Sequence, residues 1–147
     1  MTETGLLAAV DPGRSKCGVV LADPGSHTVL AAAILPPQEA RERIKRWQQQ
    51  GMAVVVLGNG TGSAAWHDHL QQLGLTVLLV DERGTTLAAR ERYWDLEGRW
   101  HWRRWLPAGL RVPPRDIDDV VAQLLLERHL GRCLARQAAA FRTGPGP

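Results

Sequence analysis

Three short apolar runs near the start of the chain, followed by runs that alternate with helical patterns, limit the folds open to this sequence. Residues 6–10, 17–22 and 27–35 are separated by brief turn-forming links, which favours an antiparallel meander. Residues 53–57 and 75–80 are two further apolar runs, each followed by a helical pattern. Strands that alternate with helices lie parallel in a sheet. The sequence therefore predicts an α/β fold with a five-stranded mixed sheet, three antiparallel strands and then two parallel ones, flanked by helices.

Four helices are expected around this sheet. Ser63 is predicted to cap the second helix, and Thr85 or Thr86 the third, since short polar side chains accept hydrogen bonds from a first helical turn. Gly51 is the expected stop of the first helix. The helices are predicted from Pro36 and Pro37 to about Gln50, from Ala64 to Leu73, from Thr85 or Thr86 to about Leu96, and from Asp116 to about Arg136.

The 147-residue length predicts one domain, over residues 1–140, and a disordered Gly- and Pro-rich tail at 141–147. No apolar stretch is long enough to cross a bilayer, and the first residues lack the basic and apolar regions of a secretory signal. We therefore expect a cytoplasmic protein without a membrane partner, in which Cys17 and Cys133 are reduced thiols.

The charge of the chain favours an anionic partner. The formal net charge is +3, and arginine supplies nearly all of the basic residues, with lysine only at Lys16 and Lys45. Arginine makes bidentate contacts to phosphate. A net positive charge attracts nucleic acids without specifying a fold.

Three carboxylates stand where a phosphodiesterase would need them. Asp11 closes one apolar run, Glu82 closes another, and Asp118 opens an amphipathic helix. The carboxyl ends of parallel strands meet at one edge of a sheet, where sites form. Clustered carboxylates there bind Mg²⁺ or Mn²⁺, which can activate water for phosphodiester hydrolysis. Taken singly, each acid is more often a turn residue that hydrogen-bonds its own backbone.

The last helix offers two neighbouring acids for the third position. Its apolar face places Asp118 on the flank, where a carboxylate can reach the edge of the sheet, and points Asp119 away from that face. We therefore predict that Asp118 faces Asp11 and that Asp119 faces solvent as a first-turn acid. A solvated first-turn acid, favourable near a helix N-terminus, is also the alternative for Asp118.

The loop over residues 58–63 (GNGTGS) leads from a strand into a helix, so its backbone amides can hold a phosphate. A tight strand-to-helix turn is the alternative, and the loop is not a Walker A motif. Substrate contacts are expected from this loop and from residues near the three acids. They are Arg14, Lys16, Asn59, Thr61, Arg83 and Thr85.

The segment over residues 100–105 (WHWRRW) concentrates tryptophan and arginine. Aromatic rings and guanidinium groups together suit unpaired bases and phosphates, so Arg103 and Arg104 join the expected substrate contacts. The alternative is a loop fixed to the core by large rings. Nucleic-acid binding requires at least one of Trp100, Trp102 and Trp105 to be exposed near the acids, whereas a core anchor is buried, and we expect alternate tryptophans to be buried and exposed.

Three stretches of the sequence resemble the YqgF family of RuvC-like nucleases, which have an RNase H-like fold. They are residues 10–18 (VDPGRSKCG), 81–90 (DERGTTLAAR) and 117–122 (IDDVVA). They match the family's Asp-x-Gly turn, its Asp-Glu-Arg-x-Thr-Thr segment and its Asp before an Ala-rich helix. The resemblance runs from about Leu6 to Leu130, and the second stretch is the most specific. Lys16 and Cys17 stand where common members have Arg and Ile.

The resemblance implies a Mg²⁺- or Mn²⁺-dependent nuclease in which Asp11, Glu82 and Asp118 are the catalytic and metal-binding acids. Family members have been assigned to pre-16S rRNA processing and to Holliday junction resolution, so the expected partner is RNA or branched DNA, bound by a monomer or homodimer. The alternatives are a nucleic-acid-binding factor without turnover and an actin-like phosphotransferase, for which the chain is short.

Overall fold

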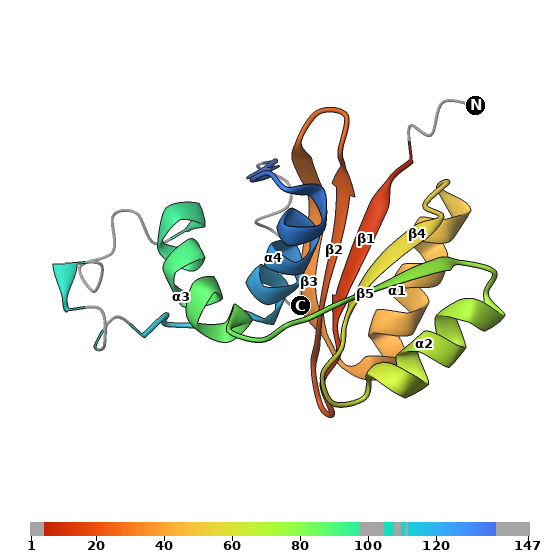
Figure 1. The fold of residues 1–147 in the computed structure, drawn as a ribbon, viewed down its shortest axis with the longest axis horizontal. Helices are drawn as coiled ribbons and strands as arrows, with labels where there is room; N and C mark the ends of the chain where they lie inside the picture. Colours follow the sequence, from red (N-terminus) through yellow and green to blue (C-terminus); the bar gives the residue numbers. More distant parts are fainter. Residues whose placement is uncertain (1–4, 98–104, 108–109, 111, 138–147) are drawn as a thin grey trace.

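A single mixed sheet forms the centre of the computed structural model, which describes residues 5–97, 105–107, 110 and 112–137 (Figure 1). In these residues the strands are β1 (Leu7–Asp11), β2 (Cys17–Asp23), β3 (Thr28–Leu35), β4 (Val54–Gly58), β5 (Thr76–Val80) and β6 (Ala135–Arg136). They lie in the order β5-β4-β1-β2-β3-β6. β1 to β3 are antiparallel neighbours, and β4 and β5 extend the sheet in parallel with β1. The predicted mixed sheet is confirmed, with one strand more than expected.

The extra strand follows a last helix that is shorter than predicted. Helix α4 (Asp118–Leu130) starts two residues after Asp116 and ends where Gly131 adopts a φ of 71°. A glycine in this left-handed conformation commonly ends a helix. The chain then turns back, and Ala135 pairs in parallel with Thr28 of β3. A two-residue strand carries no periodic pattern, so the prediction of a helix to about Arg136 was wrong.

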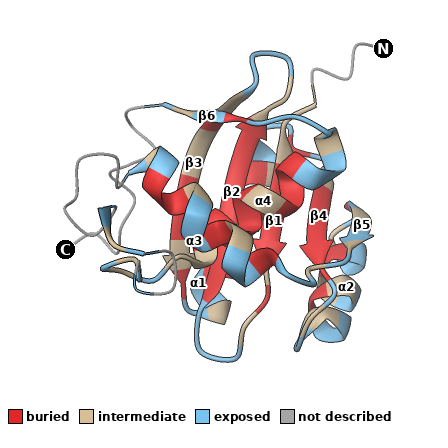
Figure 2. Cartoon of the chain, turned by 60° about the vertical axis from the view of Figure 1, so that its left-hand side comes forward, coloured by how far each residue is buried: buried red, intermediate tan, exposed pale blue. Residues whose placement is uncertain are grey.

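The central strands are buried on both faces because their apolar runs are continuous. On β1, Ala8 and Val10 pack into the cluster on one face of the sheet, and Ala9 into the cluster on the other. On β2, Val19 and Val20 divide in the same way. An uninterrupted apolar run is what a strand covered on both sides requires, and Figure 2 shows these strands buried between the helices.

Helices cover both faces of the sheet (Figure 1). α1 (Pro37–Gln49) and α2 (Ser63–Gln72) cover one face, where Ile44 and Trp66 join the core. α4 covers the other face through Leu125 and Leu126, and α3 (Thr85–Leu96) packs against the outer side of α4. The sheet is therefore the middle layer between helices.

Two helix starts differ from the prediction. Gly62 and Gly84 occupy the capping positions of α2 and α3, both with positive φ, and no side chain caps either helix. Ser63 and Thr85 are instead the first residues of their helices. The glycines direct each chain sharply from a strand end into a helix, which a polar cap in extended conformation would not do. The expected start of α1 at Pro37 and its stop at Gly51, whose φ is 105°, are confirmed.

The tail at 141–147, and Arg103 and Arg104 with their neighbouring tryptophans Trp100 and Trp102, lie outside the described residues. The predictions made for them stay predictions. Among the helices that the structure describes, none combines the length and the apolar character needed to cross a membrane.

Candidate active site

Asp11 and Glu82 form a carboxyl pair at the end of the sheet where β1, β4 and β5 finish. Asp11 is the last residue of β1, and Glu82 follows β5 by two residues. Burial, the charges of Glu82 and Asp118, and a hydrogen bond with Glu82 raise the pKa of Asp11 to about 7. Burial also raises the pKa of Glu82, with a further contribution from Asp81. Two carboxyls that crowd each other in this way share a proton near neutral pH.

The glycines of the loop after β4 make room for Glu82. A Cβ atom at Gly60 would collide with Glu82 Oε1, and one at Gly58 with Glu82 Oε2. Glu82 Oε2 is buried and has no hydrogen-bond partner. A buried carboxylate oxygen without a donor is costly, so this oxygen is suited to receive a cation.

Asp118 lies near this pair, at the first turn of α4. α4 approaches the sheet so closely here that a Cβ atom at Gly18 of β2 would collide with the Asp118 carbonyl oxygen. Burial raises the pKa of Asp118, as do the charges of Asp116 and Asp119, while Lys16 lowers it. Asp118 in turn contributes to the raised pKa of Asp11. The three predicted acids are therefore electrostatically coupled.

The coupling does not amount to a complete metal site. Among the described residues, no three His, Cys, Asp or Glu side chains are close enough together to hold a metal ion. Asp11 and Glu82 are in hydrogen-bond contact, whereas Asp118 acts on Asp11 through its charge. The ionised forms of three neighbouring carboxyls repel one another, and this repulsion favours a third acid at longer range.

Asp119 is buried, so the prediction that it faces solvent was wrong. Its side chain is 7% exposed, and its two oxygens accept hydrogen bonds from Arg115 Nη1 at 2.9 Å and Arg136 Nη1 at 2.9 Å. Burial alone would raise the pKa of Asp119, but the hydrogen bonds and charges of Arg115 and Arg136 lower it. The helical periodicity missed this because Arg136 comes from β6, which folds back beside α4.

The predicted basic residues near the acids are all exposed, and one of them, Lys16, forms an ion pair. Arg14 and Arg83 are exposed near the acids. Lys16 Nζ donates to Asp116 Oδ2 at 2.5 Å, in a pair whose side chains are both more than half exposed. A solvent-exposed pair of this kind is worth little and exchanges readily. All three side chains thus remain accessible to a phosphate.

The polar residues predicted to contact substrate differ in their exposure and in their hydrogen-bond partners. The Glu82 backbone N–H donates to Asn59 Oδ1 at 3.2 Å, and Thr61 is exposed. Thr85 is buried, and its hydroxyl donates to the Glu82 carbonyl oxygen. Asn59 and Thr85 therefore support the turn that carries Glu82.

Sequence reasoning missed one residue near the site. Arg128, in the last turn of α4, donates from Nη1 to the carbonyl oxygens of Asp81 and Arg83, both at 3.2 Å. A last-turn arginine usually indicates only a favourable interaction with the helix dipole. No local pattern could have shown that it reaches a turn some 45 residues earlier in the chain.

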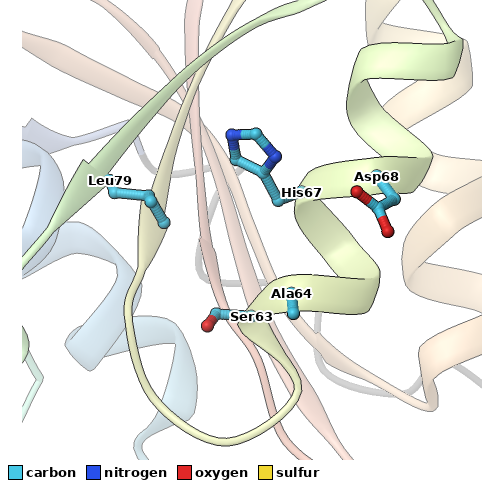
Figure 3. A pocket seen from close by; sticks show the side chains of 5 residues that line it. All are labelled: Ser63, Ala64, His67, Asp68 and Leu79. Carbon is cyan, nitrogen blue, oxygen red and sulfur yellow. The ribbon is translucent and has the colours of Figure 1, made fainter.

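A shallow pocket between α2 and β5 contains none of the predicted site residues. It is lined by Ser63, Ala64, His67, Asp68 and Leu79. The His67 ring extends into the space beside β5, the Ser63 hydroxyl lies one turn away, and the Asp68 carboxylate points to the other side of the helix (Figure 3). These side chains do not converge on a common point, so we assign the pocket no chemistry.

Comparison with known proteins is consistent with the fold. No model of a known protein family matches the chain. The large terminase nuclease from thermophilic phage G20c is similar at a TM-score of 0.50 and 15% identity, over 83% of this chain and 80% of that one. T. thermophilus RuvC in complex with Holliday junction substrate is similar at a TM-score of 0.48 and 16% identity, over 85% and 96%. The strand order and the likeness to the terminase nuclease show an RNase H-like fold.

Curated relatives narrow the class further. A Coxiella burnetii protein (strain Dugway 5J108-111) named "Putative pre-16S rRNA nuclease" is 29% identical over 136 residues, which cover 82% of this chain and 88% of the relative. The protein of the same name from strain CbuK_Q154 is 28% identical over the same shares. The resemblance to the YqgF family is thereby confirmed.

Proposed function

We propose that this protein is a metal-dependent nuclease that hydrolyses phosphodiester bonds of structured nucleic acid in the cytoplasm. The observation that carries the proposal is the Asp11–Glu82 carboxyl pair, with Asp118 coupled to it, at the carboxyl ends of the parallel strands. Sites of α/β sheets form at that edge. The name of the curated relatives, "Putative pre-16S rRNA nuclease", supports the same class of reaction.

The residues present fit a divalent cation. Asp11 and Glu82 share a proton that a cation can replace, and Glu82 Oε2 is buried without a partner. Oxygen donors suit Mg²⁺ and Mn²⁺. Asp11 and Glu82 would hold the ion, with Asp118 as the third ligand once the charge of the ion offsets the repulsion among the carboxylates. The ion would supply a water of lowered pKa and offset negative charge at the phosphorus.

Residues of the chain itself would position the substrate. Arg14, Lys16 and Arg83 are exposed near the acids and carry the charge that phosphates require. Their guanidinium and ammonium groups can fix the phosphates on either side of the bond that is cleaved. A pre-16S rRNA fragment is the first substrate to test, because the relatives carry that name, and branched DNA is the second.

A cleavage panel tests the proposal. Labelled pre-16S rRNA fragments and Holliday junctions are incubated with wild-type protein and Asp11→Asn, with Mn²⁺ or with EDTA. We expect products only with wild-type protein and metal, because the substitution removes a charge the ion needs. Binding without product under any metal would instead indicate a nucleic-acid-binding factor, and cleavage by purified Asp11→Asn would remove Asp11 from the reaction.

A further inference from the structure

The turn that carries Glu82 is held from outside by residues of two other elements. Asn59, from the loop after β4, accepts a hydrogen bond from the Glu82 N–H at 3.2 Å. Arg128 of α4 donates to the Asp81 and Arg83 carbonyl oxygens, both at 3.2 Å. The Asp81–Glu82 peptide group is therefore held at both its C=O and its N–H by side chains distant in sequence, and the Arg83 carbonyl is held as well.

This external support compensates for the exposed position of the turn. β5 is at the edge of the sheet and has a strand on one side only, and its residues are half-buried or exposed. Asp81 and Arg83 are themselves exposed. Without further contacts the turn would be anchored mainly through Thr85, whose hydroxyl and N–H both donate to the Glu82 carbonyl oxygen.

We propose that Arg128 and Asn59 are positioning residues that hold the Glu82 carboxylate toward Asp11 and thereby set the affinity of the site for its divalent ion; this rests on the proposed function. One guanidinium nitrogen that bonds the Asp81 and Arg83 carbonyls restricts rotation of the 81–82 and 83–84 peptide planes. Asn59 restricts the same 81–82 plane through its N–H. A ligand held in place loses less conformational entropy when the ion binds.

The same arrangement links two of the three acids through one helix. Asp118 is in the first turn of α4 and Arg128 in its last, about 15 Å apart at 1.5 Å per residue. α4 thus supplies one acid directly and fixes the turn of another through Arg128. A shift of α4 against the sheet would move both acids together.

The simpler interpretation of Arg128 is a last-turn cation that stabilises the helix C-terminus. That role predicts a lower melting temperature on substitution and no local effect near Glu82. The positioning role predicts the opposite, because Arg128 is exposed and exposed substitutions change stability little.

The test compares Arg128→Gln, Arg128→Lys and Asn59→Ala with wild-type protein, and Arg46→Gln on α1 is the control for loss of an exposed positive charge. Backbone hydrogen exchange is followed in a peptide spanning residues 78–88, without metal. Mn²⁺ affinity is measured by calorimetry, without nucleic acid. We expect faster exchange in Arg128→Gln and Asn59→Ala and a loss of Mn²⁺ affinity of about tenfold, the lower end for residues that support a metal ligand. Arg128→Lys should be intermediate and Arg46→Gln unchanged.

Unchanged exchange in both Arg128→Gln and Asn59→Ala would overturn the proposal, as would wild-type Mn²⁺ affinity in both. If Arg128→Gln does not fold, Arg128→Lys and Asn59→Ala decide on the same two measurements. If wild-type protein binds no Mn²⁺, the proposed function fails, and the exchange measurement alone decides whether the two residues hold the turn.

Discussion

At the scale of single residues, the Asp11–Glu82 pair makes the ionised form of Asp11 unfavourable, and a bound cation would stabilise that form. The raised pKa of Asp11, about 7, means that its carboxyl is protonated over much of the acid range and is forced to ionise above it. The charged form is disfavoured first by burial and then by Glu82 and Asp118. A divalent ion stabilises that charged form and competes with the proton.

The pair predicts how stability depends on pH without metal. A carboxyl with a raised pKa in the folded state binds more protons than in the unfolded state, so stability falls as pH rises from about 4 to about 7. Asp11→Asn removes this penalty. We expect its melting temperature to exceed that of wild-type protein by a few degrees at pH 8, with little difference at pH 4, in EDTA. A variant that melts below wild type at pH 8 would show that the ionised pair stabilises the fold.

Substitutions at the adjacent acids Asp118 and Asp119 should have different effects, the first on metal affinity and the second on the stability of the fold. Asp118→Asn is expected to lose at least the 10–100-fold in Mn²⁺ affinity that follows loss of a residue supporting a ligand, and to melt near wild type because Asp118 is only half-buried. Asp119→Ala leaves Arg136, whose side chain is 1% exposed, without its closest carboxylate. It should lose about 3–5 kcal/mol of stability.

Calorimetry and thermal melting on both variants check this separation, with Mn²⁺ affinity measured well below the melting transition. The reverse pattern, with weakened affinity in Asp119→Ala alone, would make Asp119 the ligand.

The sequence could predict where the Asp118 side chain lies but not the surroundings of Asp119. Periodicity gives the face of a helix, and Asp118 lies on the flank from which it couples to Asp11. The surroundings of Asp119 come from Arg115 before the helix and Arg136 after it. The approach of Arg136 depends on a chain reversal at Gly131 that the periodicity of α4 does not contain.

At the scale of elements, α4 and β6 form one unit joined by buried polar groups. Glu127 is buried and accepts hydrogen bonds from Arg92 Nη2 at 3.1 Å, Gln123 Nε2 at 3.3 Å and the Leu134 N–H at 2.6 Å. A buried charge needs such partners. Glu127 therefore connects α3, α4 and the segment that enters β6.

The element-scale prediction concerns Glu127. Glu127→Ala removes the acceptor of a buried backbone N–H and the partner of Arg92, whose side chain is 19% exposed. Breaking such a pair from one side costs about 3–5 kcal/mol. Glu42→Ala, an exposed position on α1, is the control and should stay near wild type. Chemical denaturation of both variants measures the difference, and a Glu127→Ala variant as stable as Glu42→Ala would show that the unit tolerates an unpaired Arg92.

At the scale of the whole molecule, the layers of the fold could be predicted from the apolar runs of the sequence. The connections beyond α3 could not be predicted in this way. The continuous runs in β1, β2 and β4 indicated a sheet covered on both faces, as observed. The sequence left two interpretations of the Gly-rich loop after β4, a phosphate-binding loop and a tight turn, and it did not show that Gly58 and Gly60 make room for Glu82. That contact joins the end of β4 to the turn after β5, and local patterns do not report it.

Between α3 and α4, residues 105–107 lie beyond α3 on the side away from the sheet, and residues 112–117 return to the start of α4 (Figure 1). Trp105 belongs to the first of these stretches and is 78% exposed. This exposure rules out a core-anchor role for Trp105, one of the two interpretations of the Trp-rich segment. A substrate that reaches both this segment and the acid pair has to extend over α3.

Trp105→Ala should therefore weaken nucleic-acid binding and leave the fold intact. Loss of one base stack costs about 1–3 kcal/mol of binding, whereas exposed substitutions change stability by roughly 0.5 kcal/mol or less. Leu110→Ala removes exposed apolar surface nearby without removing a ring, since Leu110 is 64% exposed, and Trp105→Phe keeps a ring that can stack.

Binding of single-stranded RNA by Asp11→Asn protein, with each of these substitutions added, is measured by fluorescence anisotropy. We expect Trp105→Ala to bind weakly and the other two close to the parent. Equal losses in Trp105→Ala and Leu110→Ala would show that apolar contact, rather than stacking, holds the RNA, and no loss in either would exclude this segment from the binding surface.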